Sequence, residues 1–150
     1  MIFPAFDWSI FWTNLFKVSA AYVLALPVGW DRESEAHSAG LRTFPIVAMA
    51  SCGYLLLMPD MTTQSRVLQG VVTGIGFVGG GAILKAGSVV RGTATAASIW
   101  NTGVIGAAIA IERYEVALIL SLLNIFTLKA LLPLKRKLDQ RPPGREREEK

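Results

Sequence analysis

Few side chains in this sequence could take part in chemistry, and the densest group lies between residues 30 and 43. If this segment is helical, Asp31 and Glu35 lie one turn apart, as do Glu33 and the single histidine, His37. Carboxylates in such a cluster could hold a hydrated divalent cation such as magnesium. The alternative is a solvated helix end on which arginines pair with the acids. We treat seven residues of this segment as one cytoplasmic motif, the Asp31–Thr43 motif: Asp31, Arg32, Glu33, Gly40, Leu41, Arg42 and Thr43.

Three further polar residues fall inside apolar stretches, where such side chains are costly unless they face other protein groups. Asn14 and Lys17 lie one turn apart in the first stretch, and Asn101 lies in the fourth. Lys17 has two interpretations: an internal charge near Asn14, or a side chain whose apolar stem reaches the membrane interface. These residues form a second group of candidate functional positions.

The sequence has no arrangement typical of an enzyme. It contains no Ser-His-Asp set with matching roles, no HExxH zinc motif and no Walker-type phosphate loop. Glycines 74, 76 and 79 fit a dinucleotide-binding pattern by spacing alone, because no strand precedes them. The lone Cys52 has no disulfide partner, and a Glu-x-x-x-His pair supplies too few ligands for a zinc site. We therefore predict no catalytic activity, no metal centre and no cofactor.

The elements that must position these residues are long and apolar. Hydrophobic residues make up 52% of the 150-residue chain and charged residues only 17%, a balance typical of membrane proteins. About 20 apolar residues cross a hydrocarbon core of roughly 30 Å. We therefore predict an all-α membrane bundle with spans at residues 8–28, 43–58, 67–84, 94–111 and 116–134. The transmembrane domain covers residues 1–134, and a basic, disordered tail follows at 135–150.

The basic residues predict the orientation of this bundle, because cytoplasmic loops of membrane proteins are enriched in Lys and Arg. An external N-terminus and a cytoplasmic C-terminus place the basic tail inside. This arrangement also leaves few cations outside: Arg32, Arg42, Lys85 and Arg91 lie inside, and Arg66 and Arg113 lie outside. The net charge of +4 and the pI near 9.5 follow from this distribution and indicate contact with anionic lipid rather than nucleic acid.

The third apolar stretch is crowded with glycine, which is a poor helix former in water. In a membrane, small residues let helices approach closely, so glycines four residues apart indicate a packing face. Gly70 and Gly74 form one such pair, Gly76 and Gly80 form a second, and Gly81 continues the first stripe. Two faces of this helix are therefore predicted to take a neighbour. The alternatives are a backbone that lines a polar path and a broken helix.

The fourth stretch carries a face of small and polar residues. Thr95, Ser98, Thr102 and Gly106 share this face by helical spacing, with Asn101 at its margin. Hydroxyl groups at such positions usually bond a carbonyl of their own helix or a neighbouring helix. We predict a packing face here, and substrate binding is the alternative.

Short motifs follow one another along the middle of the chain. They are Gly29-x-Asp-Arg-Glu33, Ala39-Gly-Leu-Arg-Thr43, Gly74-Ile-Gly-Phe-Val-Gly-Gly-Gly-Ala-Ile83, Val90-x-Gly92, Thr95-Ala-Ala-Ser-Ile-Trp100 and Ile105-Gly106. In this order and spacing the chain resembles the MgtC/SapB family of bacterial inner-membrane proteins, specifically its N-terminal transmembrane domain. The resemblance covers residues 29–106, and the ordered set is more specific than any single motif.

Some positions depart from the family pattern. Asp31 stands where the family typically has Glu, which preserves the charge, and one threonine of the motif after Gly92 has moved. After Gly106 the expected glycines are replaced by Ala110 and Glu112. The soluble C-terminal domain of some virulence-linked members is expected to be missing, so roles that rest on that domain should not be transferred.

The resemblance implies a non-enzymatic membrane protein linked to growth in low magnesium and survival inside host cells. Family members are thought to modulate other membrane proteins, including the ATP synthase. We therefore expect a regulator in the bacterial inner membrane that docks through the Gly-rich third helix, with a second copy of the chain as a further partner. The alternative is a small oligomeric ion or solute transporter or channel that uses Lys17, Asn14, Asn101 and the Thr95 face as a polar path.

Overall fold

The computed structural model describes residues 6–34, 39–58, 60–87 and 89–139. Within that part of the chain, five helices and one hairpin follow in the order α1 (Trp8–Ser34), α2 (Thr43–Leu56), α3 (Met61–Gly81), β1 (Leu84–Ala86), β2 (Val89–Arg91), α4 (Thr93–Ala110) and α5 (Tyr114–Asp139). The predicted all-α bundle of five helices is thus confirmed.

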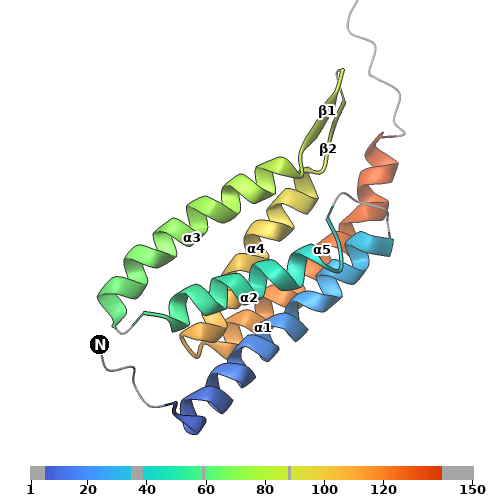
Figure 1. Ribbon diagram of the computed structural model, residues 1–150. Helices are drawn as coiled ribbons and strands as arrows, with labels where there is room; N and C mark the ends of the chain where they lie inside the picture. Colours follow the sequence, from blue (N-terminus) through green and yellow to red (C-terminus); the bar gives the residue numbers. More distant parts are fainter. Residues whose placement is uncertain (1–5, 35–38, 59, 88, 140–150) are drawn as a thin grey trace, which may run out of the picture.

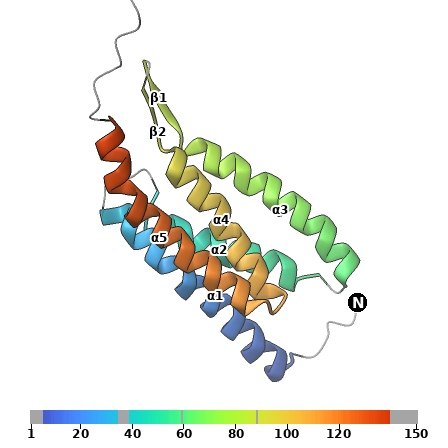
Figure 2. The same cartoon turned by 180° about the vertical axis from the view of Figure 1, so that it is seen from behind.

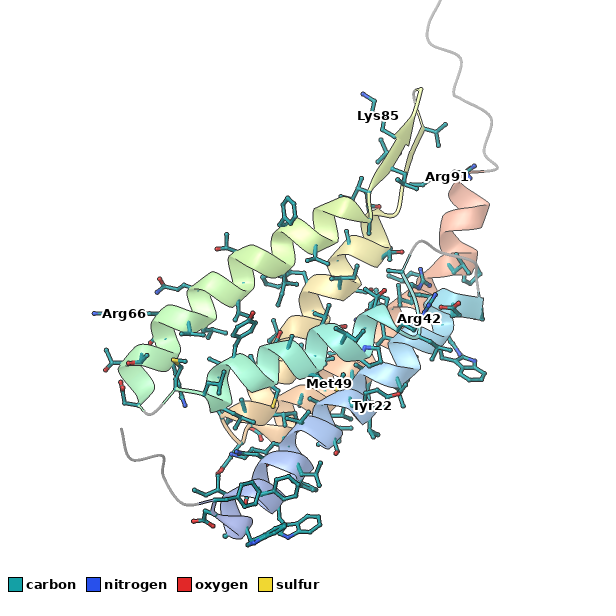
Figure 3. All side chains as sticks on the ribbon, viewed as in Figure 1. Tyr22, Arg42, Met49, Arg66, Lys85 and Arg91 are labelled. Atoms are coloured by element: carbon teal, nitrogen blue, oxygen red, sulfur yellow. The ribbon has the colours of Figure 1, made fainter. Side chains whose placement is uncertain are left out.

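Helix α4 lies at the centre of the bundle and contacts each of the other four helices. Figures 1 and 2 show the helices as inclined rods, with α3 at one edge. Successive helices run in opposite directions, so the end of α3, the start of α4 and the hairpin lie together at one end of the bundle (Figure 1). We call this end, which also carries the start of α2, the basic end, because Arg42, Lys85 and Arg91 lie there (Figure 3).

The outside of the bundle is apolar. Two stretches, Trp8–Ser34 and Tyr114–Pro133, are long and apolar enough to cross a membrane, and α2 is a shorter apolar helix. Only 17% of the most apolar part of each long stretch is buried inside the protein, whereas the core helix of a soluble protein would be mostly buried. Phe126 on α5, for example, is 64% exposed. This surface fits lipid, as predicted for a membrane bundle.

The core is built largely from small residues. Gly106 of α4 lies so close to α2 that a Cβ atom there would collide with the carbonyl oxygen of Ala48. Gly79 of α3 lies against α4, where a Cβ atom would be 3.0 Å from the carbonyl oxygen of Ala96. Such close contacts between backbones give the helices more van der Waals contact, which is what holds helices together in lipid.

Helix α3 is shifted from its predicted limits. It begins at Met61 rather than Val67, because the Asp60 carboxylate accepts hydrogen bonds from the Thr63 N–H at 2.9 Å and the Thr63 hydroxyl at 2.8 Å. This is an N-cap, which satisfies backbone donors that a helix start leaves free. The helix ends at Gly81 rather than Leu84, after three consecutive glycines that weaken it.

The predicted polar link between the third and fourth spans is an antiparallel hairpin. Leu84 pairs with Arg91, Lys85 with Val90 and Ala86 with Val89. Gly92, which ends the hairpin and precedes α4, has a φ of +88°, and a Cβ atom there would collide with the carbonyl oxygen of Ala82. Only glycine fits this position without strain.

The last helix extends beyond its predicted end. Helix α5 continues to Asp139, so residues 135–139 belong to the helix and not to a disordered tail. These residues include Leu and Lys, which favour helix formation. The rest of the predicted tail, residues 140–150, lies outside the described residues.

Candidate functional site

Lys17 is an internal charge at the end of the bundle opposite the basic end. The residue is 8% exposed, and its Nζ atom lies 2.9 Å from Glu112 Oε1 and 3.3 Å from the carbonyl oxygen of Ala110. Ala110 is the last residue of α4, so a cation here satisfies a carbonyl that the helix end leaves free and opposes the negative end of the helix dipole. Of the two interpretations of Lys17, the geometry supports the internal charge.

Glu112 holds this ion pair in an unusual backbone conformation. Its φ is +64°, and it is the one non-glycine residue with positive φ in the described chain. The Glu112 N–H donates to the Ile109 carbonyl at 3.1 Å, and the Arg113 N–H donates to the Ala108 carbonyl at 2.8 Å. This is the Schellman pattern that closes a helix, and its left-handed position is usually glycine. The ion pair to Lys17 therefore stabilises a side chain at a site where a glycine would be unstrained.

The predicted small-residue face of α4 is buried and most of its polar groups are hydrogen-bonded. The Ser98 hydroxyl donates to Asn124 Oδ1 at 2.9 Å, and the Thr102 hydroxyl donates to the Ser98 carbonyl at 2.8 Å. Asn101 donates to the Leu120 carbonyl at 3.3 Å. Thr95 is fully buried, and its hydroxyl has no partner among the described residues. The face is thus occupied chiefly by contacts between helices.

The Asp31–Thr43 motif joins α1 to α2. Asp31 and Arg32 are buried and form an ion pair, with Arg32 Nη2 2.6 Å from Asp31 Oδ2. The Glu33 carboxylate accepts a hydrogen bond from the Leu41 N–H at 3.1 Å. A Cβ atom at Gly40 would collide with that carboxylate, so this turn is tightly packed. The acids pair within the motif, as one interpretation expected, but the Asp31 pair is buried rather than solvated.

The described residues of this segment contain only part of the candidate cation site. Arg42 is exposed and Thr43 is the first residue of α2. The expected pairings of Asp31 with Glu35 and of Glu33 with His37 involve partners outside the described residues. Among the residues that the structure describes, no group of three or more His, Cys, Asp or Glu could hold a metal ion.

The predicted glycine faces of α3 are open. A Cβ atom added at any of the five predicted positions would meet nothing within 4 Å: Gly70, Gly74, Gly76, Gly80 and Gly81. These glycines therefore do not pack against the other helices that the structure describes. Gly70 and Gly74 line a groove between α3 and α2. A second groove lies between α3 and α4, and Gly76 and Gly80 line neither of the two.

The structure does not gather the polar residues of the predicted path into one site. Lys17 contacts the C-terminal end of α4, whereas Thr95 lies in its first turn. Asn14 is half-buried and its side chain makes no hydrogen bond with a described residue, so it does not join the Lys17 pair. Asn101 contacts α5 instead.

Several contributing residues were not predicted. Glu112 was noted only as a departure from the family pattern, although an acid at a helix end is a natural partner for a buried lysine. Asn124 and Ser121 of α5 were also missed; the Ser121 hydroxyl donates to the Leu24 carbonyl at 2.7 Å. Polar residues inside an apolar stretch were the available signal for both. Gly79 packs against α4 although it belongs to neither predicted glycine pair.

Comparison with known proteins gives consistent relatives. The sequence model of the MgtC family matches residues 18–137. Protein SrpB of Synechococcus elongatus is 31% identical over 143 residues, which cover 83% of this chain and 79% of that protein. Protein MgtC of Salmonella typhimurium is 30% identical over 140 residues, which cover 91% of this chain. An uncharacterized protein of Synechocystis, slr0014, is 30% identical over 132 residues and 86% of this chain.

The aligned region covers only part of the length of two of these relatives. The aligned part makes up 60% of the Salmonella protein and 56% of slr0014. No solved structure matches the chain.

Proposed function

This chain belongs to the MgtC family, and from that premise we propose that it regulates other proteins of the bacterial inner membrane by binding them through α3. The proposal excludes catalysis. It includes a role under magnesium limitation and in membrane energetics, because the family resemblance implies both. The contacts within the chain support a binding role more than a transport role.

The observation that carries the proposal is the outer face of α3, defined by Gly76, Phe77 and Gly80. Both glycines are open to their surroundings, with nothing within 4 Å of an added Cβ atom. Phe77 between them is 86% exposed, the highest value among the exposed large hydrophobic residues of the described chain. Small residues beside an exposed aromatic form a surface on which a second transmembrane helix can pack closely.

The interior gives less support to a transporter. The hydroxyls of Ser98, Thr102 and Ser51 donate to groups of the bundle itself. Lys17 pairs with Glu112 at one end rather than lining a path. Few polar groups are therefore left free to replace the hydration shell of a permeating ion.

In-membrane crosslinking tests the proposal. A photoreactive residue in place of Phe77 should crosslink to a membrane protein, identified by mass spectrometry, and the ATP synthase is the first complex to seek among the products. Gly80→Ile should abolish this product, because a branched side chain would prevent close helix approach. Gly53→Ile is the matched control, since a Cβ atom there also meets nothing but lies on α2.

Two outcomes would contradict the proposal. One is an unchanged crosslinked product in Gly80→Ile. The other is ion or solute flux into liposomes that contain only this protein, which would favour the transporter.

A further inference from the structure

Helices α2 and α3 diverge and leave an apolar groove between them. The groove has a volume of about 840 Å³, which is within the usual range of ligand sites. Its wall includes Ile46, Val47 and Ala50 of α2 and Val71, Gly74 and Val78 of α3. The Ser51 hydroxyl in this wall donates to the Val47 carbonyl at 2.9 Å, so it does not require a polar ligand. The groove is therefore suited to hydrocarbon.

The groove is open because two of its residues have no side chain. Gly70 and Gly74 both line it, and a Cβ atom at either position would meet nothing within 4 Å. Larger residues at these positions would extend into the groove. The absence of side chains thus creates space that no other described part of the chain fills.

The groove begins at the end of the bundle that carries three exposed cations. The lining begins at Thr43, and Arg42 directly precedes it. Lys85 and Arg91 lie on the hairpin that follows α3, at the same end of the bundle (Figure 3). All three are exposed, and none forms an ion pair within the described chain. An anionic group at this end would therefore meet unpaired positive charge, worth about 1 kcal/mol per Lys or Arg at a membrane surface.

The length of the groove matches one leaflet of a bilayer. Along α2 it runs from Thr43 to Tyr54, about 17 Å at roughly 1.5 Å per residue, and half of a hydrocarbon core of roughly 30 Å is about 15 Å. A partner helix would continue through both leaflets. An acyl chain that starts at the basic end would finish near the far end of the groove.

We propose that the groove between α2 and α3 is a binding site for an anionic phospholipid. One acyl chain lies along Gly70 and Gly74, and the phosphate lies beside Arg42 at the basic end, which also carries the hairpin cations. This site is separate from the outer face of α3, so it does not depend on the proposed regulatory role.

Native mass spectrometry of the full chain in mild detergent tests the site. Two lipids with identical acyl chains are added in parallel, phosphatidylglycerol with an anionic headgroup and phosphatidylcholine with a zwitterionic one. Phosphatidylglycerol should remain bound preferentially. Arg42→Gln should weaken that binding about fivefold, and Lys85→Gln with Arg91→Gln should weaken it further.

Two variants complete the experiment. Arg66→Gln is the matched control, because Arg66 is an exposed arginine at the opposite end of α3 (Figure 3), and it should leave binding unchanged. Gly74→Leu should fill the groove and remove the bound phosphatidylglycerol while helicity, measured by circular dichroism, is unchanged.

Three results would overturn the proposal. The first is equal retention of the two lipids. The second is equal phosphatidylglycerol binding by the Arg42→Gln and Arg66→Gln proteins. The third is a dimer that Gly74→Leu dissociates without loss of bound lipid, which would assign the groove to a second copy of the chain.

Discussion

Lys17 and Glu112 meet across 95 residues of sequence, and each compensates for a cost that the other would face alone. The lysine would be a buried charge without a counter-ion. Without the lysine, the glutamate would keep a Cβ atom in a left-handed backbone conformation that favours glycine, with no ion pair to offset the strain. The pair is half exposed, because the Glu112 side chain is 67% accessible, so its net contribution is smaller than that of a fully buried pair.

Replacing Glu112 separates these two effects. Glu112→Ala and Glu112→Gly both remove the carboxylate, but only glycine accepts the φ of +64° without strain. We expect Glu112→Gly to be more stable than Glu112→Ala by about 1 kcal/mol. Unfolding in detergent, followed by tryptophan fluorescence, measures the difference. Equal stability of the two variants would contradict the backbone argument.

The Asp60 cap at the start of α3 should make the stability of the protein depend on pH. Two hydrogen bonds lower the pKa of the Asp60 carboxyl below its ordinary value of 3.8. The bond from the Thr63 N–H has the larger effect, and the bond from the Thr63 hydroxyl has the next largest. Because the folded chain favours the carboxylate, this contribution to stability is present above the ordinary pKa and is lost as the pH falls through the lowered pKa.

Asp60→Asn provides the measurement. Asparagine caps a helix about as well as aspartate but does not titrate. The unfolding temperature of the variant should therefore fall less than that of the wild-type protein when the pH is lowered below 4. Parallel acid profiles for the two proteins would contradict the assignment of the cap.

At the scale of elements, α4 organises the bundle because its small residues allow four helices to approach it. Its contact with α2 at Gly106 involves backbone against backbone, so it cannot be relieved by a rotation of a side chain. The glycines of α3 other than Gly79 have a different role. They leave the surface of an edge helix open, and we propose that lipid or protein partners bind there.

Matched Gly→Ala substitutions distinguish these two kinds of glycine. Gly106→Ala should destabilise the protein by about 1–3 kcal/mol, because the added methyl group collides with the Ala48 carbonyl. Gly80→Ala should leave stability unchanged or slightly higher, because alanine is the better helix former and meets no neighbour. Unfolding in a denaturing detergent measures both. A destabilised Gly80→Ala protein would indicate that the outer face of α3 is packed in the folded protein.

At the scale of the whole molecule, charge and apolar surface are separated along the bundle. The sides carry exposed apolar residues, and three exposed cations, Arg42, Lys85 and Arg91, lie at the basic end. A bilayer favours this arrangement, since cations are retained on the cytoplasmic side during insertion.

The predicted orientation can be measured by labelling single cysteines in intact cells, with the buried Cys52 replaced by Ser. Lys85→Cys at the basic end should react only after the membrane is made permeable, whereas Arg66→Cys at the opposite end should react with an impermeant reagent from outside. The reverse pattern would place the basic end outside and would contradict the predicted orientation.

The sequence by itself determined the helices and the family. The lengths of the apolar stretches required five helices, because backbone groups in lipid must be satisfied within each segment. The ordered motifs identified the relatives. The errors lay at helix ends, where local groups decide the limits: the Asp60 cap lengthened α3 at its start, and the glycines before Ala82 shortened it.

Only the tertiary structure decided how these elements are used. Periodicity gives the faces of a helix but not which of them meets a neighbour, because that depends on how helices distant in sequence rotate and diverge. The structure therefore assigned Gly79 and Gly106 to packing and left Gly70, Gly74, Gly76, Gly80 and Gly81 open. For the same reason it paired Lys17 with Glu112, a contact that no local pattern encodes.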